Sequence, residues 1–366
     1  MKGYYITTYS SLNDSIQDGV TKKITSQIDT LNNIGFSVQL LKLYNNTYIF
    51  EKIKRKFFSS YYFNQLSEEI YNCDFFYLRK FMVTKSLLGL LKIIKLKSNA
   101  KILIEIPTYP YDKETTGSFS NVLTLLLDKV YRKILYKYVD RIVTFSNDDE
   151  IFKIKTIKIV NGIDCSQISA RSSFNNSNSF NIVAVAKFST WHGYDRLIKG
   201  LHLYYQNNPE KTVNVYFAGD GDTLPYYKQL TKDLNLCNYI FFKGFLTGDQ
   251  LDELFDIADI AACSFGFHRT GVFLGSFLKS REYLARGIPM LSSTKIDIFP
   301  HNFPYCHYVP EDETPLDIHE IIKYYNNLLI NKNITEISKE IRQFAKDNCD
   351  MSKTMVPVIN YLKSNL

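Results

Sequence analysis

The stretch NIVAVAKFSTWHGYDRLIKGL at residues 181–201 changes its hydrophobic pattern halfway along. Its first six residues form a short apolar run, which is typical of a buried strand. After a turn through Lys187 and His192, a helical pattern begins at Gly193. A buried strand that leads directly into a helix is the repeating unit of a parallel α/β sheet. We therefore expect this part of the chain to form such a sheet.

Strand and helix signals alternate twice along the chain. In the first half, β-rich runs occur at 4–9, 36–41, 74–78, 101–106, 141–145 and 156–160, and helical patterns include 20–34, 84–97 and 119–138. In the second half, β-rich runs occur at 181–186, 213–219, 239–244, 259–263, 289–293 and 307–310, and helices begin near 193, 223, 247 and 276. This order predicts an α/β protein with two doubly wound, Rossmann-like domains.

Length and composition set the limits of this prediction. A chain of 366 residues is too long for one ordinary core, so we expect two domains, at 1–165 and 180–344. The Ser- and Asn-rich segment 165–180 has no periodicity and is the predicted junction. Hydrophobic content of 45% and charged content of 22% are those of a soluble globular protein. No apolar run reaches the ~20 residues of a transmembrane helix, and the N-terminus does not resemble a signal peptide.

Cysteine spacing and charge narrow the classes further. The six cysteines form no C-x-x-C pair and no zinc pattern, which indicates reduced thiols in a cytosolic protein. Residues 1–165 contain 24 Lys and Arg against 16 Asp and Glu, whereas residues 166–366 contain 20 against 21. The basic excess therefore belongs to the first half. Its expected partner is anionic: a membrane surface, a lipid diphosphate or nucleic acid.

Two loops in the second half suit a nucleoside diphosphate and its sugar. Lys187 and His192 lie in the strand-to-helix turn described above, and a second helix follows the loop TGVFLGS at 270–276 and ends at Gly287. Cations and helix N-termini favour anions. This second helix carries Glu282 in its predicted first turns, where a carboxylate is able to accept hydrogen bonds from ribose hydroxyls.

These stretches resemble the donor domain of retaining glycosyltransferases of family 4, particularly enzymes of bacterial capsule and exopolysaccharide synthesis. The resemblance extends from about Asp18 to about Asp317 and includes the segments EIPTYPYDKE (105–114), IKIVNGID (157–164), VYFAGDGD (215–222), FFKGFLTGDQL (241–251) and YVPEDE (308–313). It implies the GT-B architecture, with an acceptor-binding first domain facing a donor-binding second domain across a cleft. The last helix, 345–366, is then expected to complete the first domain.

The resemblance implies roles for several residues on the donor side. The family's usual Arg and Lys, which contact the diphosphate, correspond here to Lys187 and His192, directly before Gly193. Glu282 matches the second acid of the family's two-acid motif, but Leu274 stands where the first acid belongs, so the backbone of Gly275 and Ser276 is the expected substitute. The remaining expected donor residues are Phe245, Leu246 and Lys279, together with Gly219, whose turn has a structural role first. Arg269 follows the β-rich run 259–263, where α/β proteins place ligands, and a plain surface loop explains it equally well.

On the acceptor side the resemblance points to Gly19, in the glycine loop after the first strand, and to the loop after 101–106. Its candidate hydrogen-bonding residues are Tyr109, Tyr111, Asp112 and Glu114. All six histidines lie at 192 or beyond, so no first-domain His is available, and the catalytic residues stay unassigned. The letters DGD at 220–222 belong to a glycine turn, and we expect transfer without a metal or a cofactor, from a UDP- or GDP-sugar.

The basic and aromatic segments 50–63 and 84–97 each have two interpretations. We interpret 84–97 as a helix packed on its sheet with lysines in water. We favour a membrane surface for 50–63, since strand pairing needs no such charge.

The sequence therefore predicts a cytoplasmic glycosyltransferase, peripheral at the inner face of the membrane. It would transfer a sugar from a nucleotide diphosphate donor to a lipid-linked glycan acceptor in surface polysaccharide assembly. The alternatives are a nucleotide-sugar epimerase, which needs His or acids near the sugar from both domains, and a non-catalytic partner of another transferase, which the losses at Leu274 and His192 favour. Nucleic-acid binding is not expected, because the aromatics follow no stacking motif.

Overall fold

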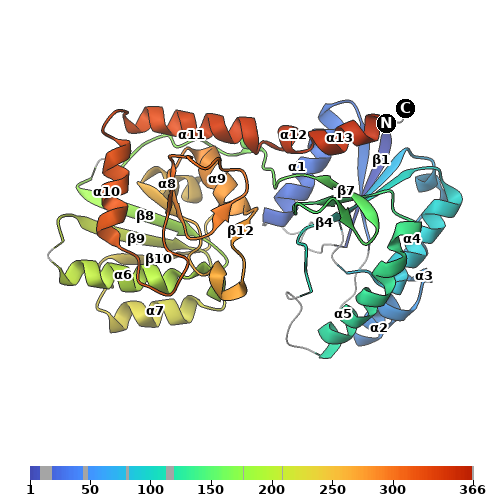
Figure 1. The fold of residues 1–366 in the computed structure, drawn as a ribbon, viewed down its shortest axis with the longest axis horizontal. Helices are drawn as coiled ribbons and strands as arrows, with labels where there is room; N and C mark the ends of the chain where they lie inside the picture. Colours follow the sequence, from blue (N-terminus) through green and yellow to red (C-terminus); the bar gives the residue numbers. More distant parts are fainter. Residues whose placement is uncertain are drawn as a thin grey trace. The chain divides into compact units, whose positions relative to one another are not determined.

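The computed structural model describes residues 1–8, 19–43, 48–79, 82–112, 119–175, 177–207 and 209–364. Glu114, which the sequence proposed for the acceptor side, lies outside these ranges. The chain divides into two compact units (Figure 1). The first comprises Met1–Asn161 and Met351–Leu366, and the second comprises Gly162–Asp350.

The first unit is built on a seven-stranded sheet in the order β2-β1-β3-β4-β5-β7-β6. All neighbouring strands are parallel except β6 and β7, which form a hairpin. The strands are β1 (Lys2–Thr7), β2 (Ser37–Lys42), β3 (Phe75–Arg79), β4 (Lys101–Ile106), β5 (Arg141–Thr144), β6 (Glu150–Ile151) and β7 (Ile154–Lys158). The central strands β3 and β4 are buried along almost their whole length, as expected of a sheet covered on both faces.

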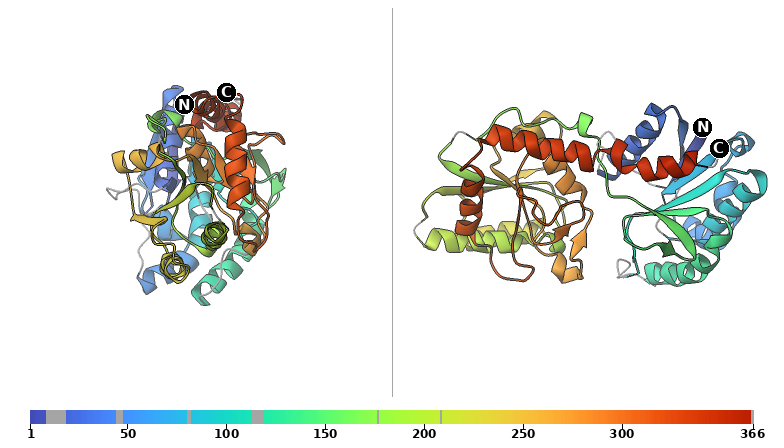
Figure 2. Two further views of the ribbon diagram at one scale, coloured as in Figure 1. Left: turned by 90° about the vertical axis from the view of Figure 1, so that its left-hand side faces the viewer. Right: turned by 45° about the horizontal axis from the view of Figure 1, so that its top comes forward.

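Helices cover both faces of this sheet (Figures 1 and 2). One face packs on α1 (Gly19–Asn33), α12 (Met351–Thr354) and α13 (Val356–Lys363), so the end of the chain contributes Met355, Val358 and Leu362 to the first core. The other face packs on α3 (Ser60–Phe63), α4 (Lys85–Lys97) and η3 (Arg132–Lys137). The same unit contains α2 (Ile49–Phe57), η2 (Glu68–Tyr71) and α5 (Phe119–Tyr131).

Segment 84–97 is a helix that packs on the sheet, as the sequence analysis interpreted it. Leu87, Leu90, Leu91 and Ile94 of α4 are buried against the sheet. No helix was predicted for the segments that form α2 and α3.

The second unit has a six-stranded parallel sheet in the order β10-β9-β8-β11-β13-β15. Its strands are β8 (Ser179–Val185), β9 (Thr212–Ala218), β10 (Ile240–Gly244), β11 (Ile260–Ala262), β13 (Met290–Ser292) and β15 (Cys306–Tyr308). A separate pair is formed by β12 (Leu274–Gly275) and β14 (Lys295–Ile296). The order reverses between β8 and β11, which defines the topological switch point of this doubly wound sheet.

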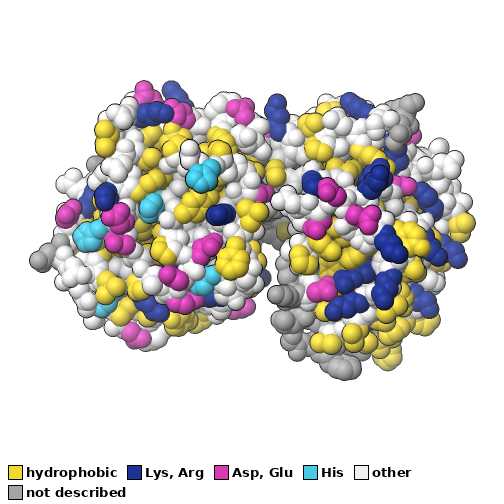
Figure 3. Space-filling view, in the orientation of Figure 1, with side chains coloured by type: hydrophobic (Ala, Val, Ile, Leu, Met, Phe, Trp, Pro, Cys, Tyr) yellow, Lys and Arg dark blue, Asp and Glu magenta, His cyan; other side chains and the backbone are white. Residues whose placement is uncertain are grey.

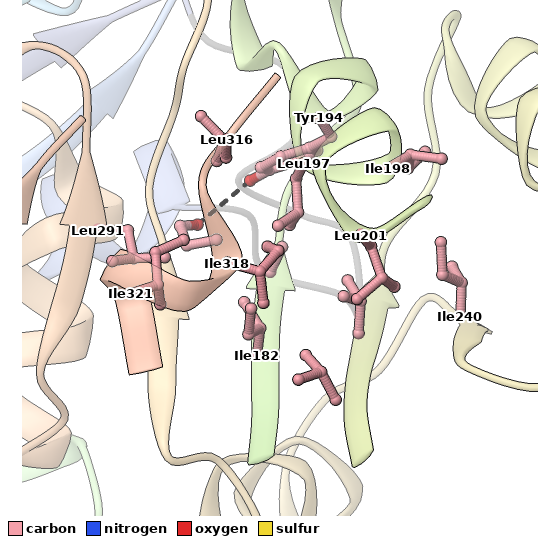
Figure 4. Packing of buried hydrophobic residues seen from close by; sticks show 14 of the residues in the cluster. Ile182, Tyr194, Leu197, Ile198, Leu201, Ile240, Leu291, Leu316, Ile318 and Ile321 are labelled. Atoms are coloured by element: carbon pink, nitrogen blue, oxygen red, sulfur yellow. Dashed lines mark hydrogen bonds between the residues drawn. The ribbon is translucent and has the colours of Figure 1, made fainter. Parts of the chain in front are cut away.

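Two sets of helices enclose the second sheet. One set is α6 (Tyr194–Gln206), α7 (Leu224–Asp233) and α10 (Ile318–Leu328), and the other is α8 (Asp249–Asp256), α9 (Leu278–Arg286) and α11 (Ile334–Asn348). Figure 4 shows the core between the second sheet and the first of these sets, where Leu197 and Leu201 of α6 and Ile321 of α10 meet Ile182 of β8. Short 3₁₀ turns are η4 (Cys165–Gln167), η5 (Thr190–His192) and η6 (Phe267–Thr270).

Segment 165–180 is part of the second unit, although the sequence suggested a linker. The buried Arg171 guanidinium donates to the carbonyl oxygens of Ala258 and Gly287, at 2.6 and 3.1 Å. Asn175 Nδ2 donates to Asp259 Oδ2 at 2.7 Å. These partners lie more than 80 residues away, so local composition alone did not reveal them.

Candidate functional site

The candidate site lies at the carboxyl edge of the second sheet, around its switch point. The loop after β8 carries Lys187 and His192, and the loop after the neighbouring strand β11 carries Cys263 and Arg269. Open α/β sheets bind ligands outside the carboxyl ends of their strands at such a point. The topology therefore brings the two loops, far apart in sequence, to the place where a ligand is expected.

Backbone contacts hold these two loops together. The carbonyl oxygen of His192 accepts from the Phe265 amide at 2.8 Å, and that of Trp191 accepts from the Gly266 amide at 3.2 Å. Gly193 has φ +62°, and a Cβ there would lie 2.6 Å from the Gly266 nitrogen. No other residue fits this left-handed position against a neighbouring backbone. The role of Gly193 in the structure is thus to allow the close approach.

His192 is a neutral hydrogen-bond donor in this loop. Its Nδ1 accepts from the Ser189 amide at 3.0 Å, while Ser189 accepts from the His192 backbone in a reciprocal cap. Since Nδ1 is an acceptor, the proton of the neutral ring belongs on Nε2. Burial, together with the nearby charge of Lys279, lowers the pKa of His192 to about 2. The ring of His192 is therefore neutral at pH 7, unlike the Lys that the resemblance implies at this position.

Lys279 brings a cation to the same place from another element. Its Nζ donates to Tyr194 Oη at 2.8 Å and to the Cys263 carbonyl oxygen at 3.1 Å. The ring of Tyr194 stacks on His192 with 5.5 Å between centroids. Burial lowers the pKa of Lys279 to about 7. The ammonium meets no carboxylate in the described part of the chain, and two of its three donors go to neutral oxygens.

Tyr194 is the residue that connects these groups, and the sequence analysis missed it. It is fully buried in the core, and its hydroxyl lies 2.8 Å from the Cys263 carbonyl oxygen. Figure 4 shows Tyr194 on α6 above Leu197. A large aromatic directly after the loop glycine was the available signal. Its contact with Lys279 was hidden, because the two are 85 residues apart.

Lys187 lies on the surface at the end of β8, between the buried β8 and the buried Phe188. Phe188 pairs with Gly221, and this bridge fixes the direction of the loop after β8. The position agrees with contact to an anion at the switch point, and the diphosphate role of Lys187 stays a prediction.

Arg269 has another task than the one predicted. Its guanidinium donates to both carboxylate oxygens of Asp195, at 3.1 and 2.9 Å, and to both of Glu313, at 2.8 and 2.6 Å. Its fifth N–H donates to the Thr190 carbonyl oxygen at 2.8 Å. The bonds from Glu313 and Asp195 raise the pKa of Arg269. With all five donors occupied, Arg269 ties η5, η6 and α6 together, and no donor is left for a phosphate.

Glu282 lies in the second turn of α9, which begins at Leu278. Its Oε1 accepts from Arg286, four residues further along the same helix, at 3.2 Å. Oε2 accepts no hydrogen bond from the described residues, and the side chain is partly exposed. One oxygen therefore stays available for a hydroxyl, and the ribose role stays a prediction.

The expected substitute for the first motif acid is a short strand. Leu274 is exposed, and Gly275 pairs with Ile296 in the β12–β14 ladder. The Phe277 ring lies so close to Gly275 that a Cβ there would clash with it. Ser276 Oγ accepts from Arg281 at 3.2 Å. These contacts hold residues 274–276 in place, and their role as the substitute for the first motif acid stays a prediction.

Of the other donor-side residues, Gly219 has a structural reason for its identity, because at φ +126° a Cβ would lie 1.9 Å from the Ala186 carbonyl oxygen. Phe245 is exposed after β10, whereas Leu246 packs against the core between the second sheet and α8, α9 and α11. Only Phe245 of this pair offers a large free apolar surface to a base.

The predicted acceptor residues of the first unit have internal partners. Tyr111 is buried, and its hydroxyl donates to Asp128 Oδ2 at 2.9 Å. Asp112 accepts two bonds from Arg132, at 2.7 and 3.2 Å, which hold its pKa below the usual range. Tyr109 packs against the core beside Tyr111, and Gly19 is the exposed first residue of α1. Tyr111 thus has a structural role, which its distant partner Asp128 concealed.

A buried ionic network at the carboxyl edge of the first sheet was not predicted. Glu105 accepts from Lys23 Nζ at 3.3 Å and from Arg79 through Oε1, and from Gln27 and Tyr77 through Oε2 at 2.8 and 2.5 Å. Burial alone would raise the pKa of Glu105, but the two cations outweigh it and lower the pKa to about 2. The acid inside the apolar strand KILIEI was the signal in the sequence.

Two features are absent from the described ranges: a cluster of metal ligands and a membrane-spanning helix. No group of three or more His, Cys, Asp or Glu side chains lies together as a metal site requires. None of the helices there is both long and apolar enough to cross a bilayer.

Residues 166–301, within the second unit, match the family Glycosyl transferases group 1. A comparison with curated proteins found no match. Among solved structures, a glycosyltransferase from Rickettsia africae ESF-5 is similar with a TM-score of 0.64 and 15% identity, over 100% of this chain and 99% of the other.

Two further solved structures match along their whole length. Sucrose-phosphate synthase from Thermosynechococcus elongatus has a TM-score of 0.69 and 12% identity, and Anabaena HepE in complex with UDP has a TM-score of 0.61 and 14% identity, each over 100% of both chains. At these identities the likeness concerns the fold, and it confirms the predicted fold class with two Rossmann-like units. The matched domain and the shared fold support a glycosyltransferase, as the sequence predicted.

Proposed function

We propose that this chain transfers a sugar from a nucleotide diphosphate donor, with retention of configuration and without a metal, to a glycan carried on a lipid. The donor would lie at the carboxyl edge of the second sheet, and the first unit would present the acceptor. The reaction would belong to surface polysaccharide assembly on the inner face of the cell membrane. The family match over 166–301 and the UDP complex of HepE support the nucleotide-sugar part of this proposal.

The observation that carries the proposal is the uncompensated cation at the switch point. Lys279 supplies the positive charge that position 192 lacks, and its ammonium meets only neutral oxygens. His192 adds a neutral N–H through Nε2, and Lys187 adds a surface cation. Preorganised donors of this kind stabilise the charge that develops on a leaving diphosphate. Glu282 Oε2 would accept from the ribose.

A thermal-shift experiment tests the donor site. UDP, GDP, CDP and their sugars are added in turn to the native protein and to Glu282→Ala and Lys187→Ala, with Glu320→Ala as a control at an exposed position of the same unit. We expect one base to stabilise the native chain and the control, by about 2.7 kcal/mol at a hundred times Kd, and the site variants less. No stabilisation by any nucleotide at millimolar concentration would contradict the proposal.

Release of nucleoside diphosphate from a bound nucleotide-sugar distinguishes a glycosyltransferase from an epimerase and from a non-catalytic partner. A transferase releases the nucleoside diphosphate as it transfers the sugar, slowly when the sugar goes to water and faster when it goes to the acceptor. Chelators leave the rate unchanged if no metal takes part. An epimerase returns an isomeric nucleotide-sugar with the diphosphate intact. Tight binding of the donor without either product would assign a non-catalytic partner.

A further inference from the structure

A row of apolar side chains lies exposed on the helical segment 119–137 of the first unit. Leu126 is 56% exposed and Val130 is 60% exposed, and Val122 continues the row in α5 at the same spacing of four residues, while Ile134 is exposed in the 3₁₀ helix η3 that follows. Residues four apart lie on one face of a helix. Single exposed apolar residues are ordinary, but a continuous row marks a surface that contacts something.

Cations accompany this row, and carboxylates of the same segment do not. Lys129, Lys133 and Lys137 are exposed at matching intervals. Asp128 is the one acid between 119 and 137, and it is buried, where it accepts from Tyr111. One acid from outside the segment lies beside it: Asp112 pairs with Arg132, and its Oδ2 lies 3.6 Å from Lys129 Nζ. Figure 3 shows Lys and Arg side chains gathered with hydrophobic ones over this part of the first unit.

A second helix repeats the combination. In α2, Phe50 is 78% exposed, and Ile53 and Phe57 lie exposed three and seven residues further on. Lys52 and Lys54 are exposed between them, and Lys54 pairs with Glu51 of the same helix at 2.8 Å. Figures 1 and 2 place α2 and α5 at the same end of the first unit. Two helices with the same chemistry therefore belong to one end of one unit.

We propose that α2 and the segment 119–137 dock the first unit on the surface of an anionic lipid bilayer. A helix lying in a membrane interface has an apolar face flanked by Lys and Arg, which is the pattern found twice here. The core of a protein interface is instead depleted in Lys. This inference names the surface for the membrane association proposed above. It uses no donor-site residue, so its failure is distinguishable from failure of the transferase proposal.

Sedimentation with vesicles tests the surface. The full chain is mixed with vesicles of phosphatidylcholine, with or without phosphatidylglycerol, at low and at high salt. We expect binding to the anionic vesicles that weakens with salt. The double variant Leu126→Ser, Val130→Ser should lose at least tenfold in affinity. The double variant Lys133→Gln, Lys137→Gln should lose about thirtyfold, at roughly 1 kcal/mol for each cation.

The matched control is Ile330→Ser, which removes an apolar side chain that is 71% exposed in the second unit and should leave vesicle binding unchanged. Unfolding midpoints and the affinity for the nucleoside diphosphate chosen by thermal shift, both measured without vesicles, should be the same in all variants. The proposal is overturned if the native chain does not bind anionic vesicles at low salt, or if Leu126→Ser, Val130→Ser binds as well as the native chain. It is also overturned if the native chain is a dimer that this variant dissociates, because the row then contacts a second copy.

Discussion

At the carboxyl edge of the first sheet, Lys23 and Arg79 both donate to the buried Glu105. At the same edge of the second sheet, Lys279 donates to Tyr194 and to a carbonyl oxygen, and it meets no carboxylate of the described chain. The two edges are topologically alike, since both are carboxyl ends of parallel strands. Their cations differ in whether the protein itself neutralises them. The first pair stabilises the fold, and the second cation is left for an anionic ligand.

The largest effect is expected where the neutralising acid is removed. Glu105→Gln leaves Lys23 and Arg79 buried without an anion, and breaking a buried pair in this way costs about 3–5 kcal/mol. Urea unfolding of the variant measures this loss. The matched control is Glu320→Gln, whose partner Lys323 is exposed and whose pair should contribute at most about 0.5 kcal/mol. An equal loss in both variants would mean that the network does not stabilise the first unit.

The same network predicts a pH window. The pKa of Glu105 is lowered from its ordinary 4.5 to about 2 in the folded chain, so the unfolded chain binds the proton first as the pH falls. The stabilisation is therefore complete above pH 4.5 and is lost between 4.5 and about 2. Unfolding free energies measured across this range should fall in the native chain and change less in Glu105→Gln. Parallel curves for the two proteins would contradict the assigned pKa.

A smaller effect is expected for the uncompensated cation. Lys279→Met removes a charge-assisted contact to the diphosphate, worth about 1.5–3 kcal/mol, or roughly tenfold to 150-fold in affinity. Calorimetric titration with the nucleoside diphosphate chosen by thermal shift measures it, and titration with the matching nucleoside, which lacks phosphate, should show no change. Because the buried ammonium carries a desolvation cost, the variant should fold at least as stably as the native chain. Equal diphosphate affinity in both would exclude Lys279 from the site.

The two edges also differ in what the sequence could predict. The strands and the main helices of both units followed from the alternation of apolar runs, and the positions of Lys187 and Glu282 followed from motif spacing. What the sequence could not supply were partners distant along the chain. Arg269 looked like a free cation until Asp195 and Glu313 met it, and the Tyr194–Lys279 contact joins two separate helices. Charge alone does not tell whether a cation is already paired.

The protonation of Lys279 gives the smallest and most specific test. Because its pKa is about 7 without ligand, the ammonium is present below pH 7 and is lost as the pH rises through it. Neighbouring groups do not titrate there, since the pKa of His192 is about 2 and that of Cys263 is raised to about 12 by burial. Affinity for the nucleotide-sugar should therefore weaken above pH 7, by at most about tenfold per pH unit.

Lys279→Arg separates this titration from any other cause of pH dependence. A guanidinium keeps its charge throughout this range, so the variant should bind the nucleotide-sugar with an affinity that is nearly constant between pH 6 and pH 9. The larger side chain of Lys279→Arg also changes the contact with Tyr194 and hence the affinity at any one pH. The test is therefore the slope of affinity against pH. If the slope survives in Lys279→Arg, the titrating group is not Lys279, and the difference between the two edges does not reside in this cation.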